Sequence, residues 1–174
     1  MSEREILISP SRLSPPEICV TQMGLLLHEI GRTPEDMGVF KVYPSASQQD
    51  WSSSGRLNIP AGEVFFDYHL PRTEKIDMDR ANESYADIAK QMEARPEVVC
   101  ILGVTYAVMA KSAVRNQGFT AEEIELSPSM MNLARMCWQE ILPDVNPDKH
   151  FSNAYVVWHD RQTFLRRFLI QNGH

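Results

Sequence analysis

Asp67 and His69, in the stretch EVFFDYHLP, are the residues best suited to chemistry. Apolar and polar residues alternate there as in a strand, which puts both side chains on one face, about 7 Å apart. A carboxylate beside an imidazole can orient the ring as a general base. Other interpretations stay open: two metal ligands completed by His159 or Asp160, or a half-exposed face without chemistry. We predict His69 and Asp67 as catalytic residues and assign no metal ligands.

Thr105 and Tyr106 are a second candidate site because of where they lie along the chain. They follow the apolar run VVCIL, which is typical of a strand covered on both faces, and they precede a segment with helical periodicity. Ligands are commonly bound where a parallel strand leads into a helix. Backbone amides at the start of such a helix can also hold an anionic group.

The elements that must position these residues follow from periodicity and turn signals. We expect strands at 63–70 and 98–104, a helix at 79–94, and a helix from about 106 that ends at Gly118 in the left-handed conformation. The apolar stripe of the first helix is Ala81, Tyr85, Ile88, Ala89 and Met92, and the inward set of the second is Val108, Met109, Ala113 and Val114. Strand, helix, strand in this order predicts two parallel strands joined by a crossover.

The rest of the chain predicts one α/β (α+β) domain over residues 1–174. An edge strand at 5–9 and a helix from Ser14 to Gly31 come first, and a strand at 38–43 leads into a long polar loop at about 44–61. A strand at 120–126, a helix at 128–142 with Ser127 as N-cap, and a strand at 154–158 follow. More strand or a short helix ends the chain.

Composition and charge exclude several classes of function. The 174 residues have a formal charge of −6, which argues against a nucleic-acid partner. No apolar run is long enough to span a membrane, so we expect no membrane partner and a cytoplasmic location. The three cysteines suit reduced core thiols. Glycine-rich dinucleotide and phosphate loops, the serine-hydrolase elbow and the common zinc motifs are absent from the sequence.

The segment from about 62 to 126 resembles the central part of the GNAT acyltransferase superfamily. The order EVFFDYHLP, DRANESYADIAKQM, EVVCILGVT, AVMAKSAVRNQGF carries the resemblance, and a Gly118-Phe119 pair ends the last helix. The family implies an open, mixed sheet with helices on both faces, in which two parallel strands splay apart around an acyl-CoA thioester. It implies a divergent acyl-CoA-dependent N-acyltransferase that transfers the acyl group directly to an amine, with acetyl-CoA or another acyl-CoA as co-substrate.

Residue by residue, the resemblance implies that Asp67 or His69 is the base that deprotonates the acceptor amine. Contacts with the cofactor would come from both strands and from the turn before the first helix, at Leu70, Arg72, Arg80, Thr105 and Tyr106. The chain departs from the family pattern at Glu83 and Tyr85, which occupy two small positions of the diphosphate-binding turn. Val114 replaces the usual tyrosine, and Ala107 replaces the usual asparagine.

A different class of function fits the same architecture. A non-catalytic ligand-binding or protein-interaction module would keep the fold without the diphosphate turn. Its partner surface could be the helix at 128–142, because MMNLARMCW is apolar around most of its circumference. The alternatives for that helix are burial in the core and a homodimer. Apart from such a partner, we expect a small-molecule substrate.

Overall fold

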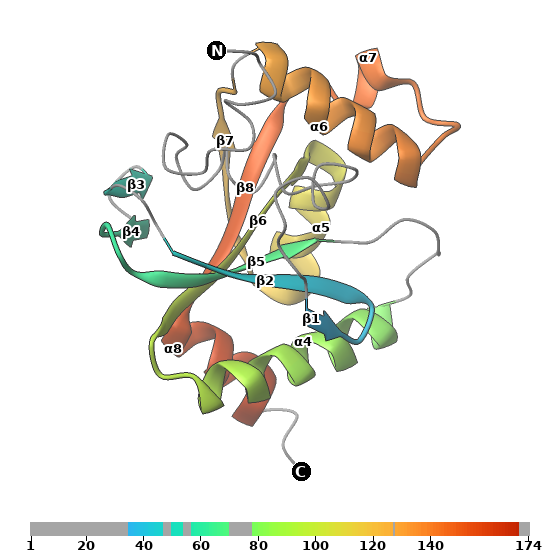
Figure 1. Cartoon of the computed structure of the whole chain (residues 1–174). Helices are drawn as coiled ribbons and strands as arrows, with labels where there is room; N and C mark the ends of the chain where they lie inside the picture. Colours follow the sequence, from blue (N-terminus) through green and yellow to red (C-terminus); the bar gives the residue numbers. More distant parts are fainter. Residues whose placement is uncertain (1–34, 47–49, 54–56, 70–77, 127, 171–174) are drawn as a thin grey trace.

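The computed structural model describes residues 35–46, 50–53, 57–69, 78–126 and 128–170. Six of its strands form one open sheet in the order β1-β2-β5-β6-β8-β7 (Figure 1). Their bounds are β1 (Glu35–Met37), β2 (Phe40–Ala46), β5 (Val64–His69), β6 (Val98–Tyr106), β7 (Thr120–Ile124) and β8 (Ala154–Asp160). In this sheet β5 and β6 are parallel, and the other neighbouring pairs are antiparallel. The predicted mixed α/β sheet with a parallel central pair is confirmed.

Helices cover both faces of this sheet. The helices are α4 (Met78–Ala94), α5 (Ala107–Gln117), α6 (Pro128–Ile141), α7 (Pro147–His150), α8 (Arg161–Phe164) and the π-helix Leu165–Ile170 that continues α8. Ile101 of β6 belongs to one core with α4, α5, α8 and the π-helix, whereas Leu102 belongs to a second core with α6. Neighbouring residues of β6 face opposite cores because successive side chains of a strand point to opposite faces.

Helix α4 has the apolar stripe that periodicity predicts. All five predicted residues are buried, and Ser84 adds a polar contact because its hydroxyl accepts a hydrogen bond from the Val39 amide at 2.9 Å. The helix ends at Ala94, before Arg95 and Pro96, since the residue before a proline avoids the helical conformation. This stripe turns α4 toward the sheet, where Tyr85 contacts Tyr68 of β5.

The inward set that we predicted for α5 is wrong at Val108, Met109 and Val114 and correct at Ala113. Val108 is 55% exposed and Val114 is 44% exposed, whereas Ala110, Ala113 and Gln117 are buried. Both sets have helical spacing, so periodicity alone cannot choose between them. The tertiary structure decides, because α5 starts directly after β6 and packs against β6 and β8 with the face that carries Ala110, Ala113 and Gln117. The predicted stop is correct, with Gly118 at φ 70°.

The predicted loop at 44–61 contains two short strands. β2 continues to Ala46, and β3 (Trp51–Ser53) pairs with β4 (Leu57–Ile59) as a separate antiparallel hairpin. Leu57 and Ile59 are buried in the core that contains α6. Pro44 interrupted the apolar pattern from which we predicted the strand. It lies beyond the part of β2 that pairs with β1, so its missing amide hydrogen costs no hydrogen bond to β1.

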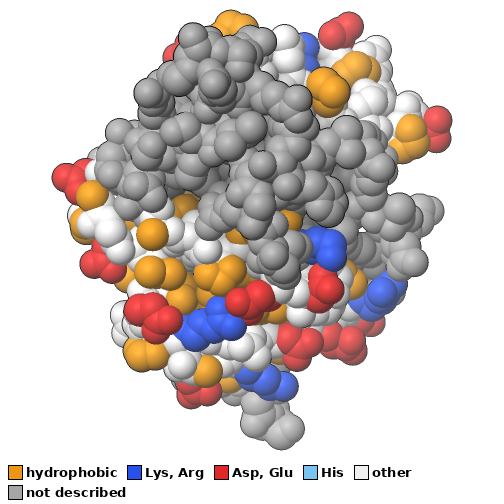
Figure 2. Space-filling view, in the orientation of Figure 1, with side chains coloured by type: hydrophobic (Ala, Val, Ile, Leu, Met, Phe, Trp, Pro, Cys, Tyr) orange, Lys and Arg blue, Asp and Glu red, His pale blue; other side chains and the backbone are white. Residues whose placement is uncertain are grey.

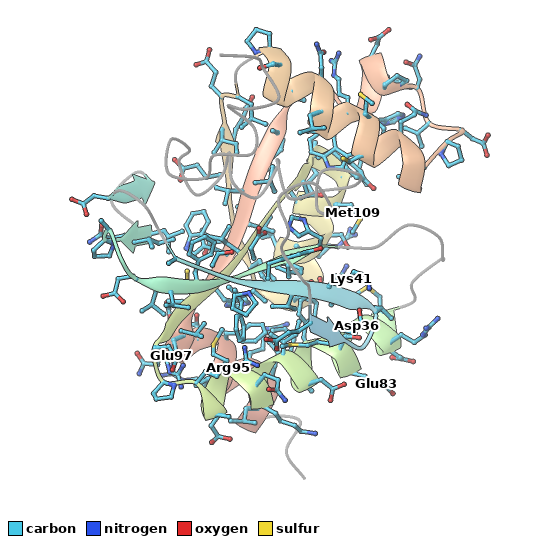
Figure 3. The ribbon with its side chains drawn as sticks, in the orientation of Figure 1. Asp36, Lys41, Glu83, Arg95, Glu97 and Met109 are labelled. Atoms are coloured by element: carbon cyan, nitrogen blue, oxygen red, sulfur yellow. The ribbon has the colours of Figure 1, made fainter. Side chains whose placement is uncertain are left out.

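Charged side chains of both signs intermix over β1, β2 and α4 (Figure 2). Lys41 pairs with Asp36 at 2.5 Å, and Arg95 forms a bidentate pair with Glu35 (Figure 3). Glu83 points outward from α4. None of the helices in the described part of the chain is long and apolar enough to cross a membrane.

Helix α6 buries one stripe and exposes another. Ala134, Cys137 and Trp138 are buried, while Met136 is 61% exposed. Core burial therefore accounts for much of the apolar surface that singled out this segment. The predicted N-terminal strand, the helix from Ser14 and the Ser127 cap lie outside the described residues.

Candidate functional site

The parallel strands β5 and β6 part at their carboxyl ends. Their pairing ends at Asp67 and Leu102. Beyond that point β5 stays paired with β2 as far as His69, and β6 stays paired with β8 as far as Tyr106. Each strand thus follows its outer partner, and the sheet opens between them. At Gly103 the backbone of β6 still lies close to Tyr68 of β5. A side chain at this position would be crowded, because an added Cβ would lie 3.1 Å from the Tyr68 carbonyl oxygen.

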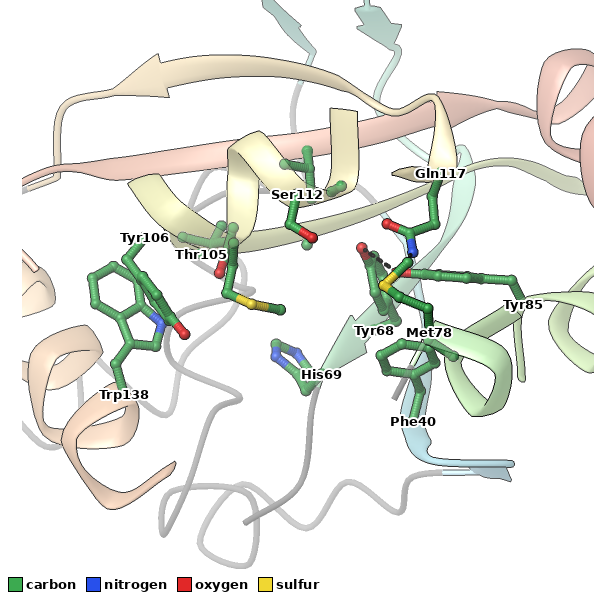
Figure 4. A pocket seen from close by; sticks show the side chains of 16 residues that line it. Phe40, Tyr68, His69, Met78, Tyr85, Thr105, Tyr106, Ser112, Gln117 and Trp138 are labelled. Atoms are coloured by element: carbon green, nitrogen blue, oxygen red, sulfur yellow. Dashed lines mark hydrogen bonds between the residues drawn. The ribbon is translucent and has the colours of Figure 1, made fainter. Parts of the chain in front are cut away.

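A pocket of about 190 Å³ lies at this opening (Figure 4). β5 and β6 form its walls, and α4, α5 and α6 each contribute side chains. It extends through the sheet, since Tyr85 and Ala113 belong to one core and Tyr106 and Trp138 to the other. The described residues that line it include no Asp, Glu, Lys or Arg. The pocket therefore suits an apolar group that carries neutral hydrogen-bonding atoms.

His69 lines this pocket and is held from behind by Asp67. The His69 Nε2 atom lies 2.8 Å from Asp67 Oδ1, and the two side chains are 7% and 0% exposed. The Tyr43 ring packs edge-on against the imidazole, with centroids 5.6 Å apart. The half-exposed interpretation of this face is therefore wrong. With Nε2 beside the carboxylate, Nδ1 is the ring nitrogen left to accept a proton.

Two phenols, those of Tyr68 and Tyr85, form the end of the pocket that faces α4, away from Tyr106 and Trp138. Tyr85 Oη donates to Tyr68 Oη at 3.3 Å, which leaves the Tyr68 hydroxyl hydrogen for another acceptor. Burial raises the pKa of both hydroxyls well above the usual value for tyrosine. Both phenols stay protonated at neutral pH and act as hydrogen-bond donors. Gln117 from α5 adds a neutral polar group at this end, and Ser112 from the same helix lies midway along the pocket (Figure 4).

The other predicted site residues divide into three groups. Thr105 and Tyr106 line the pocket together with His69, although they are 36 and 37 positions away from it along the chain. Arg80 is exposed within α4 and is not among the lining residues. Arg80 and Ala81 lie in the first turn of α4, whereas the amides of residues 82–85 are engaged in hydrogen bonds within the helix. Leu70 and Arg72 lie outside the described residues.

His159 does not join Asp67 and His69. It lies among Phe119, Phe164 and Phe168, in the core on the opposite face of the sheet. Its Nε2–H donates to the Gln117 carbonyl oxygen at 3.0 Å. Within the described ranges, no three His, Cys, Asp or Glu side chains are placed to hold a metal ion. Asp160, the other candidate, accepts a hydrogen bond from the Thr163 amide at 2.9 Å, so the metal interpretation lacks a third ligand among the described residues.

The environment of His159 predicts a dependence of stability on pH. Burial, the largest effect, lowers its pKa below 6.5, and the Arg167 charge adds to the shift, against the opposing effects of the Gln117 carbonyl and Asp160. Because the unfolded chain binds this proton more readily, the free energy of unfolding falls as pH drops from above 6.5 towards the lowered pKa. Urea unfolding at pH 7.5 and 5.5 should show this loss, and His159→Gln should reduce it.

Gln is the appropriate replacement because its amide can still donate to the Gln117 carbonyl oxygen. A His159→Gln variant that loses as much stability as the parent chain between the two pH values would contradict the assignment. His150→Gln is the control, because His150 lies in α7, which has no buried residues. It shows how much the loss of a histidine outside the core changes the dependence of stability on pH.

Cys100 is not a nucleophile in this structure. It is 1% exposed, and burial raises the pKa of its thiol to about 12. The thiolate required for nucleophilic attack is therefore negligible at neutral pH. Cys137 is also buried. Both fit the prediction of reduced core thiols.

Sequence reasoning missed several lining residues. Tyr85 belonged to the apolar stripe of α4, Trp138 to an almost uniformly apolar helix, and Gln117 to a helix end. None has a neighbouring polar pattern that would distinguish a pocket residue from a core residue. Their common location depends on where β5 and β6 separate.

Comparison with known proteins found no matching family model, no matching curated protein and no matching solved structure.

Proposed function

We propose that this chain is a divergent acyl-CoA-dependent N-acyltransferase. The observation that carries the proposal is the pocket between the separating ends of β5 and β6, into which His69 projects with Asp67 behind it. A gap between parallel strands can hold the thioester arm of an acyl-CoA while adjacent strands supply hydrogen bonds. The GNAT-like order of elements supports the same interpretation.

The proposed reaction needs no covalent enzyme intermediate. The lone pair of the acceptor amine attacks the thioester carbonyl carbon, the new C–N bond forms, and the C–S bond breaks. His69 Nδ1 takes the proton that the amine loses, and this proton passes to the departing thiolate or to solvent. Asp67 is a positioning residue, because it touches His69 and not the pocket.

Hydrogen bonds to the leaving thiolate must come from a residue other than Val114. Val114 is exposed and is not among the lining residues. The Tyr68 hydroxyl is in the pocket and has a hydrogen available, since it accepts from Tyr85. Its raised pKa favours donation of a hydrogen bond over loss of the proton. The proposed site thus uses a phenol from β5 in place of the usual one from α5.

Isothermal titration with acetyl-CoA and with longer acyl-CoAs tests the proposal. We expect saturable binding, and we expect Ser112→Trp to weaken it at least about tenfold, because Ser112 lines the pocket and the indole would fill the space for the acyl arm. Val114→Trp adds the same ring to an exposed position of α5 and should change affinity by less than about twofold. Absence of binding at millimolar acyl-CoA would sink the proposal.

A non-catalytic ligand-binding module is the second candidate. The observation that favours it is the lack of Lys or Arg among the described residues that line the pocket, because a diphosphate needs positive charge or free amides. This candidate predicts that uncharged small molecules bind while acyl-CoA does not. The same titration therefore separates the two functions.

A further inference from the structure

The end of the pocket that faces α6 presents a hydroxyl group that no protein atom uses. Tyr106 lines the pocket and is 7% exposed, and its hydroxyl makes no hydrogen bond among the described residues. Its oxygen keeps accessible surface, whereas the neighbouring Trp138 Nε1 atom is enclosed. Figure 4 shows the hydroxyl directed away from β6, on the same side as the His69 ring. A ligand atom that bonds to this largely buried hydroxyl is therefore favoured.

The neighbouring aromatic rings hold this hydroxyl in place. The Tyr106 ring lies 5.6 Å from the Trp138 ring and 4.8 Å from the Phe151 ring, and the latter two rings are 5.7 Å apart. Three mutually packed rings restrict the rotation of Tyr106. Burial raises the pKa of its hydroxyl to about 12, so the hydroxyl stays protonated at neutral pH. It is a fixed hydrogen-bonding group at one end of the pocket.

The proposed reaction determines which part of the acyl donor reaches Tyr106. Tyr68, the proposed donor to the leaving thiolate, lies at the end that faces α4, and His69 lies between Tyr68 and Tyr106 (Figure 4). A thioester with its sulfur beside Tyr68 and its carbonyl carbon beside His69 directs its acyl chain toward Tyr106. The amine reaches the carbonyl carbon from the His69 side, so the end beside Tyr106 holds the acyl chain alone.

The volume and charge of the pocket limit the acyl group. The volume of about 190 Å³ is room for roughly seven or eight non-hydrogen atoms, since a cavity of roughly 150 Å³ binds benzene, which has six. A four-carbon acyl group with one hydroxyl, counted with the oxygen and sulfur of its thioester, has about seven such atoms. A carboxylate on the chain would be buried where the described lining residues include no Lys or Arg, which is costly.

We propose that the acyl donor carries a short acyl group, of about four carbons, with a neutral hydroxyl group near its end, and that this hydroxyl forms a hydrogen bond with the Tyr106 hydroxyl. The inference rests on the proposed acyl transfer and makes Tyr106 the residue that selects the acyl group. Val104 and Met109 supply apolar contacts for the carbons of the chain. An unsubstituted chain of the same length leaves the Tyr106 hydroxyl without a partner.

The test compares 3-hydroxybutyryl-CoA with 3-methylbutyryl-CoA, which has a methyl group in place of the hydroxyl and nearly the same shape. Both are titrated calorimetrically into the parent protein and into Tyr106→Phe, with the two enantiomers of the hydroxyl compound measured separately. We expect Tyr106→Phe to weaken one enantiomer roughly 3- to 10-fold, the effect of one neutral hydrogen bond. The affinity for 3-methylbutyryl-CoA should stay within about twofold, because this compound has no group that bonds to the Tyr106 hydroxyl.

Tyr155→Phe is the matched control, because it removes the same atom from a half-buried tyrosine of β8 that is not among the lining residues. It should leave both affinities within about twofold. Binding of 3-methylbutyryl-CoA together with equal effects of Tyr106→Phe on all three compounds overturns this inference and leaves the proposed acyl transfer standing. Failure of all three compounds to bind at millimolar concentration overturns the acyl-transfer proposal and this inference with it.

Discussion

His69→Gln is expected to lower the rate of acyl transfer about 10²- to 10⁴-fold while acyl-CoA affinity stays within about threefold. The loss is the usual contribution of a general base, because glutamine cannot take the amine proton. Glutamine is close to histidine in size and can place its amide beside Asp67 Oδ1. The measurement is release of free thiol from acetyl-CoA with a panel of primary amines as acceptors, together with acyl-CoA titration of the variant.

Two further variants decide whether His69 acts as the base. Asp67→Asn should lower the rate less than His69→Gln and change the pH profile of the rate, since in the proposed mechanism Asp67 positions the imidazole without touching the pocket. His150→Gln, on α7 and outside the pocket, should keep the parental rate. A His69→Gln variant that binds acyl-CoA and keeps its full rate would remove His69 from the mechanism.

Phe119→Ala is expected to lower the free energy of unfolding by about 3–5 kcal/mol, the typical cost of truncating a buried phenylalanine. Phe119 is 2% exposed, and its ring lies 4.4 Å from His159, 5.4 Å from Tyr85 and 5.8 Å from Tyr68. Truncation leaves a cavity between rings from different elements that cannot all move inward. Urea unfolding should show a lower midpoint with an unchanged slope.

Val114→Ala provides the comparison on the neighbouring helix. Val114 is 44% exposed, so its truncation should change the free energy of unfolding by no more than about 0.5 kcal/mol. If Phe119→Ala lowers the free energy of unfolding by less than about 1 kcal/mol, the packing of Phe119 against Tyr68, Tyr85 and His159 does not stabilise this core as expected. Because Tyr68 and Tyr85 also line the pocket, the variant tests how far the core supports the candidate site.

The local elements around the site were predictable because their signals are local. The alternation in EVFFDYHLP, the stripe of α4 and the apolar run of β6 each come from residues that are close together in the chain. The left-handed stop at Gly118 was predictable for the same reason, since few residues other than glycine adopt that conformation readily. The parallel pairing of β5 and β6 follows from the helix that connects them.

Other predictions failed where two local solutions were equally good. Val108 and Val114, which we predicted to be buried, and Ala110 and Gln117, which are buried, have the same helical period, and only contact with the sheet distinguishes them. The hairpin β3–β4 was missed because its Leu57 and Ile59 are short apolar positions in a polar stretch, stabilised by packing against a distant helix.

The sequence by itself determined the strand that carries Asp67 and His69, the parallel unit beside it, and a pair of residues suited to a base. Each depends on spacing along a strand or helix, which covalent geometry transmits directly. Only the tertiary structure decided that the pair is buried, that β5 and β6 separate after Asp67 and Leu102, and that Tyr85 and Trp138 meet His69 in one pocket. Those outcomes depend on the pairing of β5 with β2 and of β6 with β8, and on packing between distant helices. Residue spacing does not encode either of them.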